Sequence, residues 1–135
     1  MDASVAAKWV LDEEHAGAAA SLLALDALHA PDHWLAEALH AVSGAARRGA
    51  LSPEEAAEGV SILLRAPVRG TPLAGLASRA FAIAAGEGTT VYDALYVALA
   101  DTLRVPLVTA DERLMRALSR SRPGAGTLRW VGDLG

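Results

Sequence analysis

The most informative part of the 135-residue sequence is YDALYVALADTLRVPLVTADERL, residues 92–114. Its first half repeats apolar residues at helical spacing, which predicts a helix over 91–103. A short apolar run at 105–108 then predicts a strand, and Asp111 follows it at the start of another predicted helix, 111–121. A short buried strand between two helices is typical of an α/β protein.

The alternation of helices and short apolar strands extends along the rest of the chain. The clearest helix start is Ser52-Pro53-Glu54-Glu55, which combines an N-cap, a proline at the first helical position and the glutamate of a capping box. We therefore predict an α/β fold with a small central parallel sheet flanked by helices, in a single domain over 1–135. The predicted helices are 4–11, 15–28, 32–49, 52–65, 73–85, 91–103 and 111–121, and the predicted strands are 28–30, 67–71, 105–108 and 128–131.

The composition excludes several classes of protein. With 53% hydrophobic residues and a mean hydropathy of +0.27, the chain can bury a core and is not intrinsically disordered. No apolar run reaches the roughly 20 residues of a membrane-spanning helix, and no basic stretch leads into an apolar one at the N-terminus. The absence of cysteine fits a reducing cytosol and leaves oxygen or imidazole as the ligands for any metal.

The charges are unevenly distributed along the chain. The formal net charge of −4 argues against non-specific coating of nucleic acid. Residues 1–64 contain three basic and ten acidic residues, whereas residues 65–135 contain nine basic and six acidic residues. In the second half Arg113, Arg116 and Arg120 recur at helical spacing. This stripe is either a solvated helix face or a surface that contacts phosphate.

Four carboxylates stand out by their positions, and three of them can reach the sheet edge where α/β proteins bind ligands. Asp2 precedes the first predicted helix, Asp93 lies in the first turn of its helix, Asp111 follows a strand, and Glu37 interrupts an apolar helical stretch. The ligand crevice of an open α/β sheet lies where strands end and helices begin. Tertiary folding alone can bring such widely spaced acids together. If three or four of them face one another, their repulsion requires a cation, and Mg²⁺ or Mn²⁺ suits oxygen ligands.

Each of these acids also has an ordinary structural interpretation. Asp93 completes a capping-box pattern, and Asp111 follows Thr109 in the same way, with Thr109 as the helix cap. Asp2 either caps the first helix or is a solvated terminal residue. Glu37 needs a cation or an arginine partner, because an unpaired carboxylate is costly to bury.

Four segments carry a resemblance to a known family. They are DASVAAKW (2–9), Ala30-Pro31 followed by Glu37, YDALYVALA (92–100) and LVTADERL (107–114). In this order they resemble the PIN-domain ribonuclease toxins of VapC type over nearly the whole chain. The resemblance implies a three-layer α/β/α PIN fold, a metal-dependent endoribonuclease that hydrolyses RNA, and a cognate VapB-type antitoxin that blocks it. It also implies a cytoplasmic homodimer.

The resemblance assigns metal binding and catalysis to four acids and a supporting role to two hydroxyl residues. These are Asp2, Glu37, Asp93 and Asp111, with Ser4 and Thr109 in support. Hydrolysis of a phosphodiester needs an activated water and stabilised charge, which Mg²⁺ or Mn²⁺ supplies. Our hypothesis is that the three aspartates bind the metal, while Glu37 binds it or orients the water. Arg113 and Arg116 are candidates for contact with the RNA backbone, because their helix begins at the same edge.

Two features depart from the family pattern. Only Met1 precedes Asp2, where the family usually has an apolar strand. The first central strand is therefore predicted to be short or missing. Two explanations are open: an upstream start was missed, or the chain was trimmed. His40 stands where the family often has asparagine. Three roles are open for it: a satisfied polar residue on the helix, a contact to phosphate, or a supplementary metal or base group.

The alternative function is a catalytically weak PIN-fold binding module that acts through antitoxin or self-association. In that case the apolar residues 9–11 are either partner contacts or core.

Overall fold

A computed structural model of the chain describes residues 1–122 and 128–134, and the structural statements below refer to this part. It contains α-helices, short parallel strands and three turns of 3₁₀-helix. The helices are α1 (Ala3–Ala7), α2 (Ala16–Ser21), α3 (Trp34–Arg47), α4 (Pro53–Arg65), α5 (Ala77–Glu87), α6 (Val91–Leu103) and α7 (Glu112–Ser121). The strands are β1 (Leu28–Pro31), β2 (Val68–Thr71), β3 (Leu107–Thr109) and β4 (Leu128–Trp130).

The strands form two parallel pairs, with β1 beside β2 and β3 beside β4. The first two residues of the chain connect the pairs: the amino group of Met1 donates to the carbonyl of His29 in β1 (3.0 Å), and the N–H of Asp2 donates to the carbonyl of Val108 in β3 (3.1 Å). The prediction of a parallel α/β fold is confirmed. In residues 1–122 and 128–134 no strand precedes α1, and the expected central sheet is divided into two pairs of strands.

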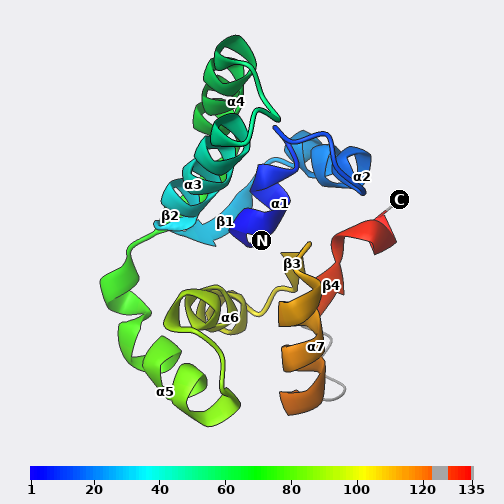
Figure 1. The fold of residues 1–135 in the computed structure, drawn as a ribbon. Coiled ribbons are helices and arrows are strands. Elements are labelled where there is room, and N and C mark those ends of the chain that lie inside the picture. The colour runs from blue at the N-terminus through cyan, green and yellow to red at the C-terminus, as the bar shows by residue number, and fades with distance from the viewer. Residues whose placement is uncertain (123–127, 135) are drawn as a thin grey trace.

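Helices cover the strands on both sides (Figure 1). Helices α3 and α4 form a hairpin that projects from one end of the molecule, and α5 packs along α6 on the other side of the strands. The short helix α1 contacts α3 and β3, while α6 contacts β1 and β3. The start of α1 is hydrogen-bonded to β3, which leads into α7, and the first turn of α6 faces the first turn of α7 through Asp93 and Arg113.

Helix α6 lies at the centre of the core. Every residue from 94 to 100 is buried, so this helix is surrounded on several sides. The apolar residues near its two ends, Tyr92 and Leu103, are 63% and 39% exposed. Helix α5 packs against α6, which also contacts β1 and β3.

Local signals fixed some element boundaries and misplaced others. The capping box at Ser52 opens α4 as predicted, and α6 has the predicted bounds. The predicted helix over 15–28 is too long, since α2 ends at Ser21 and the chain must reach β1 by Leu28. The first helix ends at Ala7 rather than at residue 11. The helix predicted over 73–85 starts four residues later, after a 3₁₀ turn.

The segment after α1 belongs to the core rather than to an exposed partner surface. Trp9 is only 8% exposed, and its indole N–H donates to the carbonyl of Ala19 at 2.9 Å. Its ring packs edge-on against Trp34, with the ring centroids 6.4 Å apart. These contacts favour the core interpretation of Trp9. In the described ranges, no helix combines the length and the apolar character needed to cross a bilayer.

Candidate functional site

Asp2 is a buried carboxylate with four hydrogen-bond donors around it. It caps α1, accepting from the backbone N–H groups of Ser4 and Val5. The hydroxyls of Ser4 and Thr109 donate to its two oxygens at 2.5 Å each. Burial raises the pKa of the Asp2 carboxyl above its ordinary value, while the two hydroxyls oppose that shift by stabilising the charged form. The capping interpretation of Asp2 is confirmed, and the solvated one is wrong, since the residue is 4% exposed.

Thr109 joins the start of the chain to the start of α7. This fully buried residue donates to Asp2 and accepts the N–H of Asp111 at 3.0 Å. The expectation that Thr109 itself caps the helix is wrong: Asp111 is the N-cap, and its carboxylate accepts from the N–H groups of Arg113 and Leu114. One residue, Ala110, lies between the end of β3 at Thr109 and the N-cap of α7. The N-cap is therefore Asp111, two positions after Thr109.

Asp93 faces Asp111 across a shared arginine. Thr90 caps α6 by accepting the N–H of Asp93, which leaves the Asp93 carboxylate available for other contacts. The guanidinium of Arg113 lies 3.7 Å from Asp93 Oδ2 and 3.4 Å from Asp111 Oδ2. Two carboxylates from different helices thus contact one positive charge.

In the described residues Glu37 is held by a tyrosine hydroxyl, and no arginine pairs with it; the expectation left open either a cation or an arginine as its partner. The hydroxyl of Tyr96 donates to Glu37 Oε2 at 2.5 Å, and His33 Nε2 lies 3.5 Å from the same oxygen. Burial and then the contact with Glu37 raise the pKa of the Tyr96 phenol far above its usual range. Tyr96 therefore stays a hydrogen-bond donor to this carboxylate.

The negative charge of Asp2 adds to the rise in the pKa of the Tyr96 phenol, after burial and Glu37. The ring of His33 packs against Tyr96 with the centroids 4.7 Å apart. The sequence analysis missed both aromatic residues. The available signal was their spacing: Tyr96 follows Asp93 by one helical turn, and His33 precedes Glu37 by one turn.

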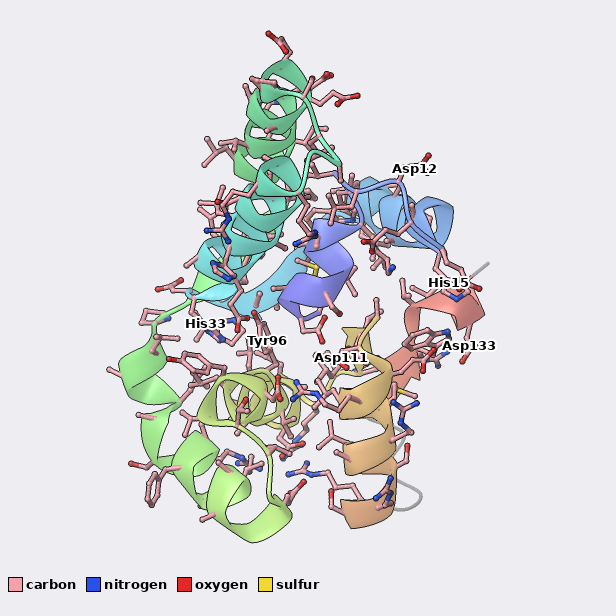
Figure 2. All side chains as sticks on the ribbon, viewed as in Figure 1. Asp12, His15, His33, Tyr96, Asp111 and Asp133 are labelled. Carbon is pink, nitrogen blue, oxygen red and sulfur yellow. The ribbon has the colours of Figure 1, made fainter. Side chains whose placement is uncertain are left out.

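Three side chains relate the four predicted acids to one another. Arg113 contacts Asp93 and Asp111, Thr109 joins Asp2 to the backbone of Asp111, and Tyr96, one helical turn after Asp93, donates to Glu37. Figure 2 places His33, Tyr96 and Asp111 along the band between α1 and α3 on one side and α6 and α7 on the other. We refer below to Asp2, Glu37, Asp93 and Asp111 as the acidic cluster.

The acidic cluster suits a divalent cation in donor type and charge, but its described geometry does not bring three ligands around one point. Within residues 1–122 and 128–134, no three carboxylate or imidazole groups are close enough to hold a metal ion between them. Nevertheless, the donors are hard oxygens of the kind that Mg²⁺ and Mn²⁺ prefer. Asp93 and Asp111 already share the positive charge of Arg113, and the charged form of the buried Asp2 would be stabilised by a nearby cation.

The two arginines proposed to contact RNA are both engaged with carboxylates. Arg113 contacts the acidic cluster, and Arg116 pairs with Glu112 one turn away at 2.9 Å. Both side chains remain more than half exposed, at 71% and 61%. His40 is exposed and lines a hollow beside Ser4, and it forms no hydrogen bond with the acidic cluster in the described part of the chain.

Comparison with known proteins identifies relatives of this chain. The profile of the PIN domain matches residues 1–119. Ribonuclease VapC12 of Mycobacterium tuberculosis is 37% identical over 117 residues, which are 87% of this chain and 89% of that protein. Ribonuclease VapC3 of the same species is 39% identical over 95 residues, 70% of this chain and 68% of that protein. Ribonuclease VapC3 of Pyrobaculum aerophilum is 34% identical over 117 residues, 84% of this chain and 89% of that protein.

Proposed function

Because this chain belongs to the PIN-domain family, among its VapC-type ribonucleases, we propose that it is the toxin of a toxin–antitoxin pair and hydrolyses RNA with the help of Mg²⁺ or Mn²⁺. The observation that supports this proposal most directly is the pairing of Asp93 and Asp111, from two helices, with one positive charge beside the buried Asp2. Two carboxylates that share one positive charge offer oxygen ligands of the kind that a divalent ion binds.

In this proposal Asp2, Asp93 and Asp111 hold the metal, and Glu37 binds it or orients the attacking water. When bound, a divalent ion lowers the pKa of a water and offsets negative charge on phosphate oxygens. The protein's own contribution is orientation. Ser4 and Thr109 fix both oxygens of Asp2.

The other two carboxylates are oriented in different ways. The N-cap of α7 fixes the position of Asp111, and Tyr96 directs the carboxylate of Glu37. Outer partners of this kind tune metal ligands by fixing their orientation.

The proposal is tested by RNA cleavage with purified, antitoxin-free protein. We expect cleavage in Mg²⁺ or Mn²⁺, loss of cleavage in chelator, and loss of cleavage in Asp93→Asn with its thermal unfolding midpoint retained. Asp26→Asn is the matched control, since it makes the same chemical change at an exposed aspartate outside the cluster. If the wild-type protein cleaves no RNA in a broad set, or Asp93→Asn cleaves as well as Asp26→Asn, the alternative of a weakly catalytic binding module takes its place.

We propose a VapB-type antitoxin and a second copy of this chain as protein partners. Family membership supports both. An apolar surface on α5 and the start of α6 supports protein contact in general, because Phe81 is 70% exposed beside Leu73 and Val91. Size-exclusion chromatography with light scattering, with and without the co-expressed antitoxin, tests both partners. A monomeric elution that the antitoxin leaves unchanged would contradict them.

A further inference from the structure

The few basic residues of the acidic N-terminal half converge on one place. Residues 1–64 contain three Lys and Arg residues, Lys8, Arg47 and Arg48, against ten acidic residues. All three line the same hollow, of about 370 Å³, between α1 and the C-terminal half of α3. Positive charge at the C-terminal end of α3 stabilises the helix dipole, and this role alone could explain Arg47 and Arg48. It does not explain Lys8, which lies at the end of a different helix, α1.

This hollow begins at the candidate site. Its walls include Ser4, whose hydroxyl donates to Asp2, and Ala110, whose backbone N–H donates to that same hydroxyl at 2.8 Å. His40 lines it one helical turn after Glu37. We call the hollow lined by Ser4, Lys8, His40, Arg47, Arg48 and Ala110 the basic hollow. It leads from the acidic cluster along α3 toward the end of that helix.

The positive charge in the basic hollow is largely uncompensated. Lys8 pairs with Glu13, which also lines the hollow, at 3.3 Å. Arg47 and Arg48 are exposed, and no carboxylate in the described ranges forms an ion pair with either. The lining therefore carries a formal charge of +2 with His40 neutral. By contrast, Arg113 and Arg116 already contact carboxylates.

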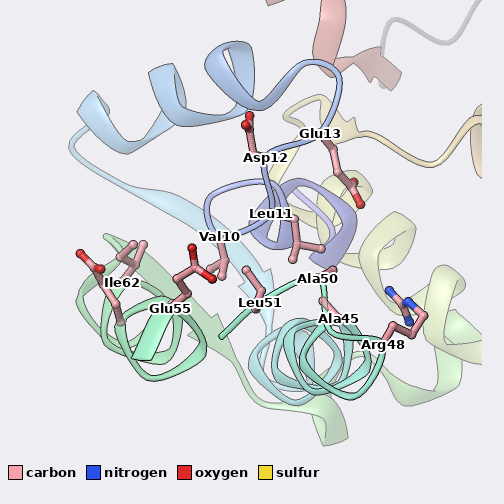
Figure 3. A pocket seen from close by; sticks show the side chains of 12 residues that line it. Val10, Leu11, Asp12, Glu13, Ala45, Arg48, Ala50, Leu51, Glu55 and Ile62 are labelled. Carbon is pink, nitrogen blue, oxygen red and sulfur yellow. The ribbon is translucent and has the colours of Figure 1, made fainter. Parts of the chain in front are cut away.

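Arg48 also borders a second groove, which is rimmed by acids (Figure 3). In that groove Glu55, a residue of α4, and the guanidinium of Arg48 lie at opposite ends. The side chain of Arg48 folds back along α3, since a Cβ added at Gly44 would stand 3.1 Å from its Nη1. The arginine thus lies on the side of the groove that faces the basic hollow.

We propose that the basic hollow binds backbone phosphates of the RNA strand on one side of the bond to be cleaved, an inference that rests on the proposed ribonuclease function. Guanidinium groups bind phosphate oxygens through paired N–H donors, and two adjacent arginines present several such donors. A single strand held there would pass from Arg47 and Arg48 across His40 to Ser4, where the acidic cluster begins.

The test measures RNA binding separately from cleavage. The probe is a fluorescein-labelled single-stranded RNA of about 12 nucleotides, a length within the range of known single-strand sites, and binding is followed by fluorescence anisotropy in chelator. The variant is Arg47→Gln/Arg48→Gln. The matched control is Arg65→Gln/Arg69→Gln, which removes the same charge from two exposed arginines that do not line the basic hollow.

We expect the Arg47→Gln/Arg48→Gln protein to bind the RNA about tenfold more weakly than the control. The slope of log affinity against log salt concentration should fall by about 1.4, since each phosphate contact with a single strand contributes about 0.7. In Mn²⁺ the KM for RNA should rise while kcat changes little, because these contacts are made equally in the ground state and the transition state.

Equal affinities and salt slopes for the two double variants would overturn the proposal. Displacement of the RNA by polyglutamate as readily as by unlabelled RNA would also overturn it, and would indicate a site for an acidic protein segment instead. Failure of the proposed ribonuclease function would give a different result from failure of the binding proposal. In that case the wild-type protein would bind the RNA in chelator but would not cleave it in Mn²⁺.

Discussion

The hydroxyl of Tyr96 donates a hydrogen bond of 2.5 Å to Oε2 of Glu37, across 59 positions of sequence. Tyr96 is 3% exposed, so its ring is fixed in the core, whereas the Glu37 side chain is 37% exposed. The same helix carries Asp93 one turn earlier. This hydrogen bond therefore links the orientation of Glu37 to the position of Asp93.

Tyr96→Phe removes this hydrogen bond and keeps the ring. We expect RNA cleavage to slow by about 10- to 100-fold, the usual loss when the outer partner of a metal-site ligand is removed, with little change in the KM for RNA. Binding of Mn²⁺, measured by calorimetry, should weaken as well. Tyr92→Phe is the matched control on the same helix, since Tyr92 is 63% exposed. Equal activities for the two variants would show that the hydroxyl of Tyr96 has no part in orienting Glu37.

Arg113→Gln removes the positive charge that Asp93 and Asp111 share. If a metal ion displaces this guanidinium, the variant should bind Mn²⁺ about 1.4- to 5-fold more tightly, because an exposed ion pair contributes roughly 0.2–1 kcal/mol. Arg116→Gln, on the same helix but paired with Glu112, should leave the affinity for Mn²⁺ unchanged. Weaker Mn²⁺ binding by Arg113→Gln would contradict competition between the arginine and the metal.

A network around Arg122 predicts a pH dependence of stability. Arg122 pairs with Glu87 at 2.8 Å and with Asp101 at 2.9 Å, and so joins α5 and α6 to the end of α7. The hydrogen bond from Arg122 lowers the pKa of Glu87 below its ordinary value of 4.5. A depressed folded-state pKa gives stability that is present above pH 4.5 and is lost as the pH falls through the folded-state pKa.

The measurement is urea unfolding of the wild type and of Glu87→Gln at neutral pH and in acid. The wild type should have the larger free energy of unfolding at neutral pH, and the difference should shrink in acid. Glu58→Gln is the control, because Glu58 is exposed and has no ion pair in the described part of the chain. A difference that persists unchanged in acid would mean that the Glu87 charge is not its source.

Gly59 allows α4 to approach the segment after α1. It is buried, and a Cβ at this position would collide with Cγ1 of Val10, whose branched side chain has little freedom to move. Gly59→Ala should therefore lower the free energy of unfolding by about 1–3 kcal/mol, despite the better helix propensity of alanine. Gly17→Ala, in α2 with nothing within 4 Å of the added carbon, should leave stability unchanged or raise it. Equal stabilities for both variants would contradict the close contact.

The sequence by itself determined the features that depend on neighbouring residues. The capping box at Ser52 and the bounds of α6 follow from hydrogen bonds and apolar spacing within one or two turns, and the structure has them as predicted. The capping role of Asp2 and the parallel α/β class follow from similarly local signals. The length of the second helix was not determined locally, because the requirement to enter β1 ended it early.

Only the tertiary structure decided how the chemistry-bearing side chains meet. The four acids were selected from the sequence by position and by family resemblance, but their connections through Thr109 and Tyr96 join residues far apart in the chain. Contacts of this range depend on how helices pack across the strands, which no local pattern specifies. For the same reason Arg113 lies between two carboxylates, whereas Arg47 and Arg48 line the hollow beside Ser4.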